Sequence, residues 1–135
     1  MKDLYSAHTS EEDMNRYYEV VAGAYRKVFK RLGLEVKYVE ASGGVFTTVP
    51  SHEFQVLTEF GEDTIYYCGQ CDFAQNKEVA KVQEGDRCPK CGGLIGVRRG
   101  VEVGNIFHFG AESSPKMGGN FPVRRGPEAS VCVSD

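Results

Sequence analysis

The sequence predicts an α+β fold, in which one long helix packs on an antiparallel sheet and a small cysteine-bearing segment is inserted between two strands. Residues 10–32 repeat apolar side chains at three- and four-residue steps, the period of an amphipathic helix. Several shorter stretches alternate apolar and polar residues, as half-buried strands do. A chain of 135 residues with 41% hydrophobic residues suits one compact domain that carries a small insertion.

The first predicted element is the helix over residues 10–32. Thr9 and Glu12 form a capping-box pattern, with a hydroxyl at the N-cap and a Glu three residues on. Acidic residues crowd the first turn and basic residues the last, which suits the helix dipole, and Gly33 is a natural stop. The apolar side chains on one face of this helix need a partner surface to pack against. Its expected apolar positions are Met14, Tyr17, Val21, Tyr25, Val28, Phe29 and Leu32.

The partner surface is predicted to be a sheet. Turn-forming residues separate its strands, with a break at Ser42–Gly44 and a turn at Gly61–Thr64. No periodic apolar pattern follows residue 112, and the pair Arg124–Arg125 in that tail reads as a solvated charge cluster. Strands are expected over residues 34–38, 54–60, 65–67, 94–97 and 101–109.

Two C-x2-C pairs are the sharpest chemical signal. Cys68 and Cys71 are separated from Cys88 and Cys91 by 16 residues, within the spacing of a four-thiolate zinc site. Each pair turns two sulfurs toward one metal, and two pairs complete a tetrahedron. Such a site has no open coordination position, so the predicted Zn²⁺ is structural. Cys132 stands alone and receives no role.

The sequence is also compatible with two alternatives to zinc. The cysteines could form two disulfides, or they could be thiols without a metal. Disulfides fit poorly with a chain that shows no signal-peptide segment and is therefore expected in the cytoplasm. No apolar run approaches the ~20 residues of a membrane helix. The net charge of −3 argues against binding nucleic acid through bulk positive charge.

Several blocks of the sequence stand in a recognisable order across residues 1–112. They read MKDLYSAH at 1–8, TSEE at 9–12, SHEF at 51–54 with GEDTI at 61–65, CGQCDFAQN at 68–76 and RGVEVGNIF at 99–107. They resemble, in the same order, segments of bacterial prolyl-tRNA synthetases, which are class II enzymes. The first block is similar to MKDxYSFH, the end of the family's second signature motif.

The resemblance implies part of a class II catalytic sheet, divided as residues 1–66, a zinc ribbon at 67–97, a return strand at 98–112 and an irregular tail at 113–135. It implies an ATP-dependent proline–tRNA ligase that uses Mg²⁺, acts on proline and tRNA(Pro), and is a homodimer at full length. Asp3 and Tyr5 would approach the amino-acid pocket, with His52 and Glu53 nearby. If the resemblance to the family is set aside, Asp3 could be a surface carboxylate, His52 a strand histidine and Glu53 half of an ion pair.

The sequence also departs from the family pattern. It contains no counterpart of the first and third signature motifs or of the second-motif arginine that grips ATP. Only 16 residues lie between Cys71 and Cys88, where most bacterial relatives carry an editing domain. We therefore expect a ligase fragment that is inactive as a lone chain, with its catalytic residues unassigned. The alternatives are a stand-alone zinc-ribbon module that binds RNA or protein, and a metal-stabilised domain without a partner.

Overall fold

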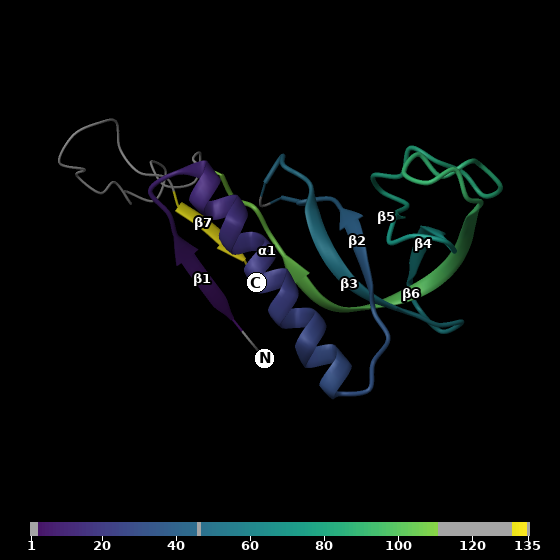
Figure 1. Cartoon of the computed structure of the whole chain (residues 1–135), viewed down its shortest axis with the longest axis horizontal. Helices are drawn as coiled ribbons and strands as arrows, with labels where there is room; N and C mark the ends of the chain where they lie inside the picture. Colours follow the sequence, from purple (N-terminus) through teal and green to yellow (C-terminus); the bar gives the residue numbers. More distant parts are fainter. Residues whose placement is uncertain (1–2, 46, 111–130, 135) are drawn as a thin grey trace.

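A computed structural model describes residues 3–45, 47–110 and 131–134, and within these ranges one helix lies between a small two-stranded sheet and a five-stranded barrel (Figure 1). This confirms the α+β class. No helix in the described ranges combines the length and apolar character that crossing a membrane requires. The elements are β1 (Leu4–Ala7), α1 (Glu11–Arg31), β2 (Lys37–Ala41), β3 (Ser51–Leu57), β4 (Asp63–Cys68), β5 (Ala74–Asn76), β6 (Ile95–Ile106) and β7 (Val131–Ser134).

Helix α1 has well-defined caps at both ends. The N-cap is Ser10, one residue after the predicted Thr9, and its hydroxyl accepts a hydrogen bond from the Asp13 amide at 3.1 Å. At the other end Gly33 takes a positive φ of 74°. The Leu34 amide then donates to the Phe29 carbonyl at 2.9 Å, which closes a Schellman motif.

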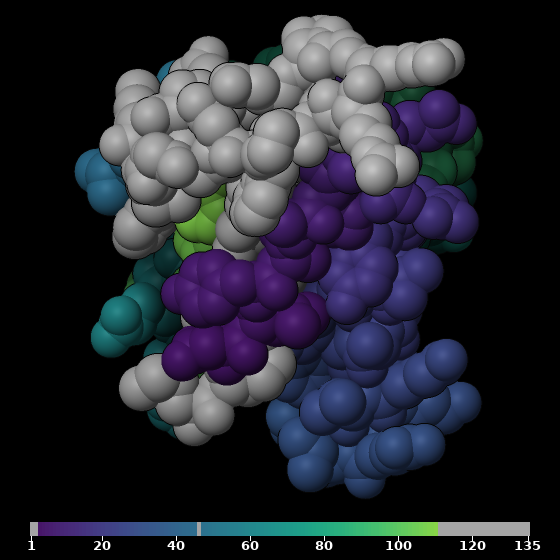
Figure 2. All heavy atoms as spheres, turned by 90° about the vertical axis from the view of Figure 1, so that its left-hand side faces the viewer, coloured from purple at the N-terminus to yellow at the C-terminus, as the bar shows by residue number. Residues whose placement is uncertain are grey.

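The buried face of α1 is narrower than the sequence predicted. Its buried residues recur at steps of about seven, whereas Tyr17, Val28 and Leu32 are exposed. Phe29 packs on Phe54 of β3 with ring centroids 5.4 Å apart. A curved barrel meets a straight helix along a thin seam, and this explains the exposed positions. The opposite face of α1 forms the violet-to-blue surface of Figure 2. The buried helix residues are Met14, Val21, Ala22 and Phe29.

The barrel strands run in the order β2-β3-β6-β4-β5. Neighbouring strands are antiparallel, except that one parallel pair, Glu40 with Gln75, joins β2 to β5 and closes the barrel. Strand β6 is continuous over 12 residues where two strands were predicted. Gly100 lies where β6 changes partner, because it pairs with Leu57 of β3 and also with Asp63 of β4.

Several strand positions differ from the sequence prediction. Strand β2 starts at Lys37 rather than residue 34, because the Leu34 amide is used to end the helix. Strand β3 starts at Ser51 rather than residue 54. Strands β5 and β7 were not predicted, and β7 pairs antiparallel with β1. Arg124 and Arg125 lie outside the described residues.

Candidate metal centre

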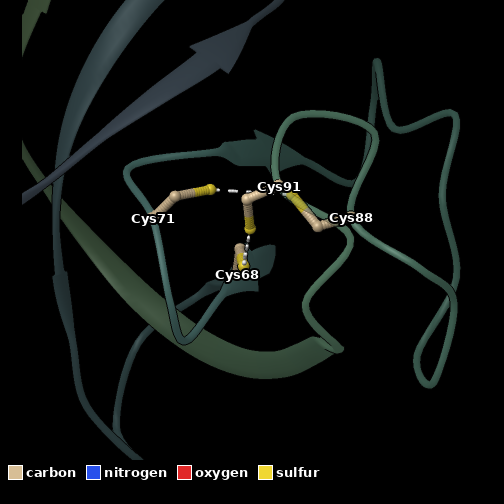
Figure 3. Close-up of side chains that lie close together, drawn as sticks. All are labelled: Cys68, Cys71, Cys88 and Cys91. Atoms are coloured by element: carbon tan, nitrogen blue, oxygen red, sulfur yellow. Dashed lines mark hydrogen bonds between the residues drawn. The ribbon is translucent and has the colours of Figure 1, made fainter.

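The four cysteines of the two C-x2-C pairs meet at one end of the barrel (Figure 3). Cys68 is the last residue of β4, and Cys88 and Cys91 lie in the loop that leads into β6. Each pair sits in a tight backbone turn. The Cys68 amide donates to the Phe73 carbonyl at 2.9 Å, and the Cys88 amide donates to the Gly93 carbonyl at 2.6 Å. The flanking strands β4 and β6 pair with each other, with Cys68 opposite Ile95.

The sulfur positions match a tetrahedral metal site. All four Sγ atoms lie within 4.8 Å of one another. The Cys68–Cys91 sulfur distance is 3.5 Å and the Cys71–Cys88 distance is 3.6 Å. Four sulfurs each about 2.3 Å from zinc would be about 3.8 Å apart. All four cysteines are free thiols, which argues against the disulfide alternative.

The local environment favours thiolate at Cys68. The Gln70 amide donates a hydrogen bond to Cys68 Sγ at 3.4 Å, and this bond is the main reason that the Cys68 pKa is lowered to about 7. Thiolate is the form that binds a metal. Cys68 and Cys88 are buried together with Ile95, whereas Cys91 is exposed. Four converging soft donors can therefore bind a metal such as zinc.

The structure places the predicted pocket residues in two separate sheets. Asp3 precedes β1, and Tyr5 lies on β1 with 70% of its surface exposed. His52 and Glu53 are neighbours on β3, so their side chains point to opposite faces of that strand. The structure therefore does not bring these side chains to one face, and their assignment to a common pocket stays a prediction.

His52 lies on the face of β3 that is covered by α1. Its ring stacks on Tyr38 at 4.4 Å between centroids, with an interplanar angle of 7°. The Tyr18 hydroxyl lies 3.0 Å from His52 Nδ1 and donates to the Ile106 carbonyl at 2.8 Å. Burial lowers the pKa of His52, so the neutral ring is favoured in this position.

Glu53 points into the barrel, where it is 8% exposed. Its carboxylate accepts hydrogen bonds from Gln55 Nε2 at 2.9 Å and Asn76 Nδ2 at 3.2 Å. Burial raises the pKa of Glu53. Sequence reasoning missed Gln55 and Asn76, because a polar residue in an alternating pattern is normally assigned to the solvent side. The signal available in the sequence was the spacing of Ser51, Glu53 and Gln55 on one face of β3.

No family model matches the chain. A proline–tRNA ligase of Nitratiruptor sp. is 51% identical over 81 residues, which is 60% of this chain and 14% of that protein. Over part of its length, this chain is similar to proline–tRNA ligases. The enzyme of Sulfurimonas denitrificans is 33% identical over 133 residues, covering 84% of this chain and 30% of that protein.

A probable mitochondrial proline–tRNA ligase of Homo sapiens is also similar, at 36% identity over 114 residues. That match covers 84% of this chain and 24% of the human protein. The chain thus spans between 14% and 30% of the length of the relatives named here. These similarities agree with the resemblance to prolyl-tRNA synthetases that the sequence blocks indicated.

Proposed function

We propose that this chain supplies part of a class II proline–tRNA ligase, which activates proline with ATP and Mg²⁺ and transfers it to tRNA(Pro). The observation that carries the proposal is the 51% identity over 81 residues to a protein named proline–tRNA ligase. Within that proposal the complete enzyme is a cytoplasmic homodimer. The 135 residues alone are inactive, because they contain no counterpart of the second-motif arginine that grips ATP in the family, or of the first and third signature motifs.

The proposed cofactor of this segment is a structural Zn²⁺ bound by Cys68, Cys71, Cys88 and Cys91. The close approach of the four sulfurs supports it. Because the site uses four thiolates, the metal has no open position for substrate and acts by holding the loop between β4 and β6 in place. In this proposal the zinc ribbon occupies the place of the editing domain, so the protein does not proofread mischarged tRNA in cis.

We further propose that Asp3, Tyr5 and His52 each contribute to the amino-acid pocket of the complete enzyme. An anionic side chain is suited to proline's secondary ammonium, which needs a charged or hydrogen-bonding partner once it leaves water. Glu53 faces the barrel interior, so we assign it an indirect role in holding β3 beneath His52.

A segment exchange tests the ligase proposal. The segment of the Nitratiruptor ligase that matches this chain over 81 residues is replaced by the matching residues from this chain. We expect this chimera to retain proline-dependent ATP–pyrophosphate exchange. A second chimera also carries residues 1–8 of this chain, and we expect Asp3→Ala to abolish the exchange activity of that second chimera. A folded chimera without any exchange activity would contradict the proposal. The purified 135-residue chain serves as the negative control, and activity in that sample would show that it is not an incomplete enzyme.

The stand-alone zinc module remains a second candidate because the barrel closes within this chain. A closed barrel with its own metal centre has what a small independent domain needs. Filter binding of the zinc-loaded chain to tRNA, compared with unrelated RNA at moderate salt, tests this candidate. Selective binding of tRNA by a chain whose chimera is inactive would favour the module over the ligase segment.

A further inference from the structure

A second group of side chains that could ligate a metal lies on the barrel, apart from the cysteines, and extends from the buried Glu53 to the exposed Glu102. Glu53 of β3, Asp63 of β4 and Glu102 of β6 bring carboxylate oxygens within 4.8 Å of one another. These strands are neighbours, with β6 between β3 and β4. We call Glu53, Asp63 and Glu102 the carboxylate cluster.

Among the described residues, no cationic side chain balances the charges of the carboxylate cluster. In the described ranges, no lysine or arginine forms an ion pair with any of its three members. Burial, followed by the negative charge of Glu53, raises the pKa of Glu102. The pKa of Glu53 is raised mainly by burial and further by Asp63. The cluster therefore concentrates negative charge where a positive ion would relieve repulsion.

A buried amide beside the cluster has an unsatisfied oxygen. Gln55 is 0% exposed, and its carboxamide reaches into the cluster, where Nε2 donates to Glu53 at 2.9 Å and to Asp63 at 2.7 Å. Its Oε1 is buried without a partner and lies against Gly100. Asn105 repeats the pattern, because Nδ2 donates to Glu102 at 3.3 Å while Oδ1 is buried without a partner.

Leaving a buried hydrogen-bond acceptor unpaired costs about 1–3 kcal/mol. Two such acceptors, Gln55 Oε1 and Asn105 Oδ1, belong to amides that contact the carboxylate cluster. Turning either amide about its last side-chain bond would direct the oxygen at the carboxylates, which is unfavourable unless a cation lies between them. A cation would turn both oxygens into ligands and remove the unsatisfied acceptors. Carboxylate and amide oxygens are the ligands of hard divalent cations.

We propose that the carboxylate cluster, together with Gln55, binds one hard divalent cation, and that Ca²⁺ binds more tightly than Mg²⁺. Ca²⁺ accepts irregular sets of oxygens about 2.3–2.6 Å away, so ligand oxygens up to about 5 Å apart fit around it, whereas Mg²⁺ demands a tighter octahedron. Glu102 is exposed and provides the side from which the ion enters. The thiolates take the softer metal, so the two sites do not compete. This site is independent of the proposed ligase role.

Calorimetric titration of the full 135-residue chain, preloaded with one equivalent of Zn²⁺, tests the proposal. Ca²⁺ is the titrant, and Mg²⁺ is titrated into a second sample. We expect one Ca²⁺ per chain with a Kd on the order of 10⁻⁴–10⁻³ M, and weaker binding of Mg²⁺. Glu102→Gln and Asp63→Asn should each weaken Ca²⁺ binding roughly tenfold or more.

Glu59→Gln is the matched control, because Glu59 is an exposed acid in the loop between β3 and β4 and lies outside the cluster. It should leave Ca²⁺ binding unchanged. The exposed position of Glu102 and its repulsion by Glu53 make Glu102→Gln safe for folding, which thermal unfolding verifies. No saturable heat at concentrations about tenfold above the expected Kd range would overturn the proposal. Equal weakening by Glu59→Gln and Glu102→Gln would do the same, because it would show diffuse attraction to surface charge.

Discussion

The half-buried histidine beneath α1 shows how much one residue depends on its surroundings. His52 is held by ring stacking on Tyr38 and by the Tyr18 hydroxyl, and neither tyrosine is near it in sequence. The Arg26 guanidinium lies over the Tyr38 ring, 4.5 Å from the ring centroid. Burial is the main cause of the lowered His52 pKa. The charged groups that also act on His52 are Glu40, Glu19 and Arg26.

This environment predicts a pH dependence of stability. Because the folded-state pKa of His52 lies below its ordinary value of about 6.5, the unfolded chain takes up the proton first as the pH falls. The contribution of the neutral ring is therefore complete above pH ~6.5 and is lost as the pH falls through the folded-state pKa. We expect the free energy of unfolding of the native chain to decline more steeply from pH ~7.5 to ~5.5 than that of His52→Gln.

Urea unfolding of the two zinc-loaded proteins at both pH values measures this difference. Comparing the variant with the native chain at each pH cancels the titration of the thiolates, because both proteins carry the same four cysteines. A stability difference that is the same at both pH values would show that protonation of His52 is not linked to folding.

At the scale of elements, the ends of α1 and the ends of the strands follow different rules. A helix end is decided by a few adjacent residues, as at Ser10 and Gly33. A strand is decided by what lies beside it. Strand β5 has only three residues and is polar apart from Ala74, and it exists because it pairs with β4 and meets β2.

The N-cap offers a direct test at this scale. Ser10→Ala removes the hydroxyl that accepts from the Asp13 amide, and we expect a loss of about 1 kcal/mol in the free energy of unfolding. Thr9→Ala is the matched control, since it deletes the neighbouring exposed hydroxyl and should change stability by less than about 0.5 kcal/mol. Urea titrations of both variants make the comparison. The reverse order of effects would restore Thr9 as the cap.

For the whole molecule, the metal centre and the helix–barrel core are separate sources of stability. The core between α1 and β3 contains Phe29 and Phe54, whereas the cysteine cluster packs around Ile95 at the far end of β4 and β6. Removing the metal should therefore loosen the loop between Cys68 and Ile95 and leave the helix on the barrel.

Metal removal tests this division. At free zinc 100-fold above its Kd, bound metal adds about 2.7 kcal/mol to stability, so chelation should lower the Tm. Trypsin should then cut first at Lys77, Lys81 or Arg87, which are exposed in the loop. Cys91→Ser should reproduce the sensitivity with zinc present, whereas Cys132→Ser, the change of the fifth cysteine, should still bind one zinc per chain. First cleavage within α1 would contradict the separation of the two parts.

The amino-acid sequence was sufficient for features that depend on near neighbours. The helix period placed α1 to within a residue at each end. The cysteine spacing predicted a four-sulfur cluster, which the structure brings together, because each C-x2-C turn is a local geometry repeated twice. The ordered blocks predicted the similarity to proline–tRNA ligases that the comparisons support.

Other features were decided only by the tertiary structure. Successive side chains along β3 point to opposite faces of the strand, but the sequence does not tell which of these faces the barrel encloses. For this reason Glu53 and Gln55 were not recognised as interior residues. The closing of the barrel through Glu40 and Gln75, and the pairing of β7 with β1, join residues far apart in the chain. Contacts of this kind gain free energy only when the remaining strands are already in place, and no local pattern records them.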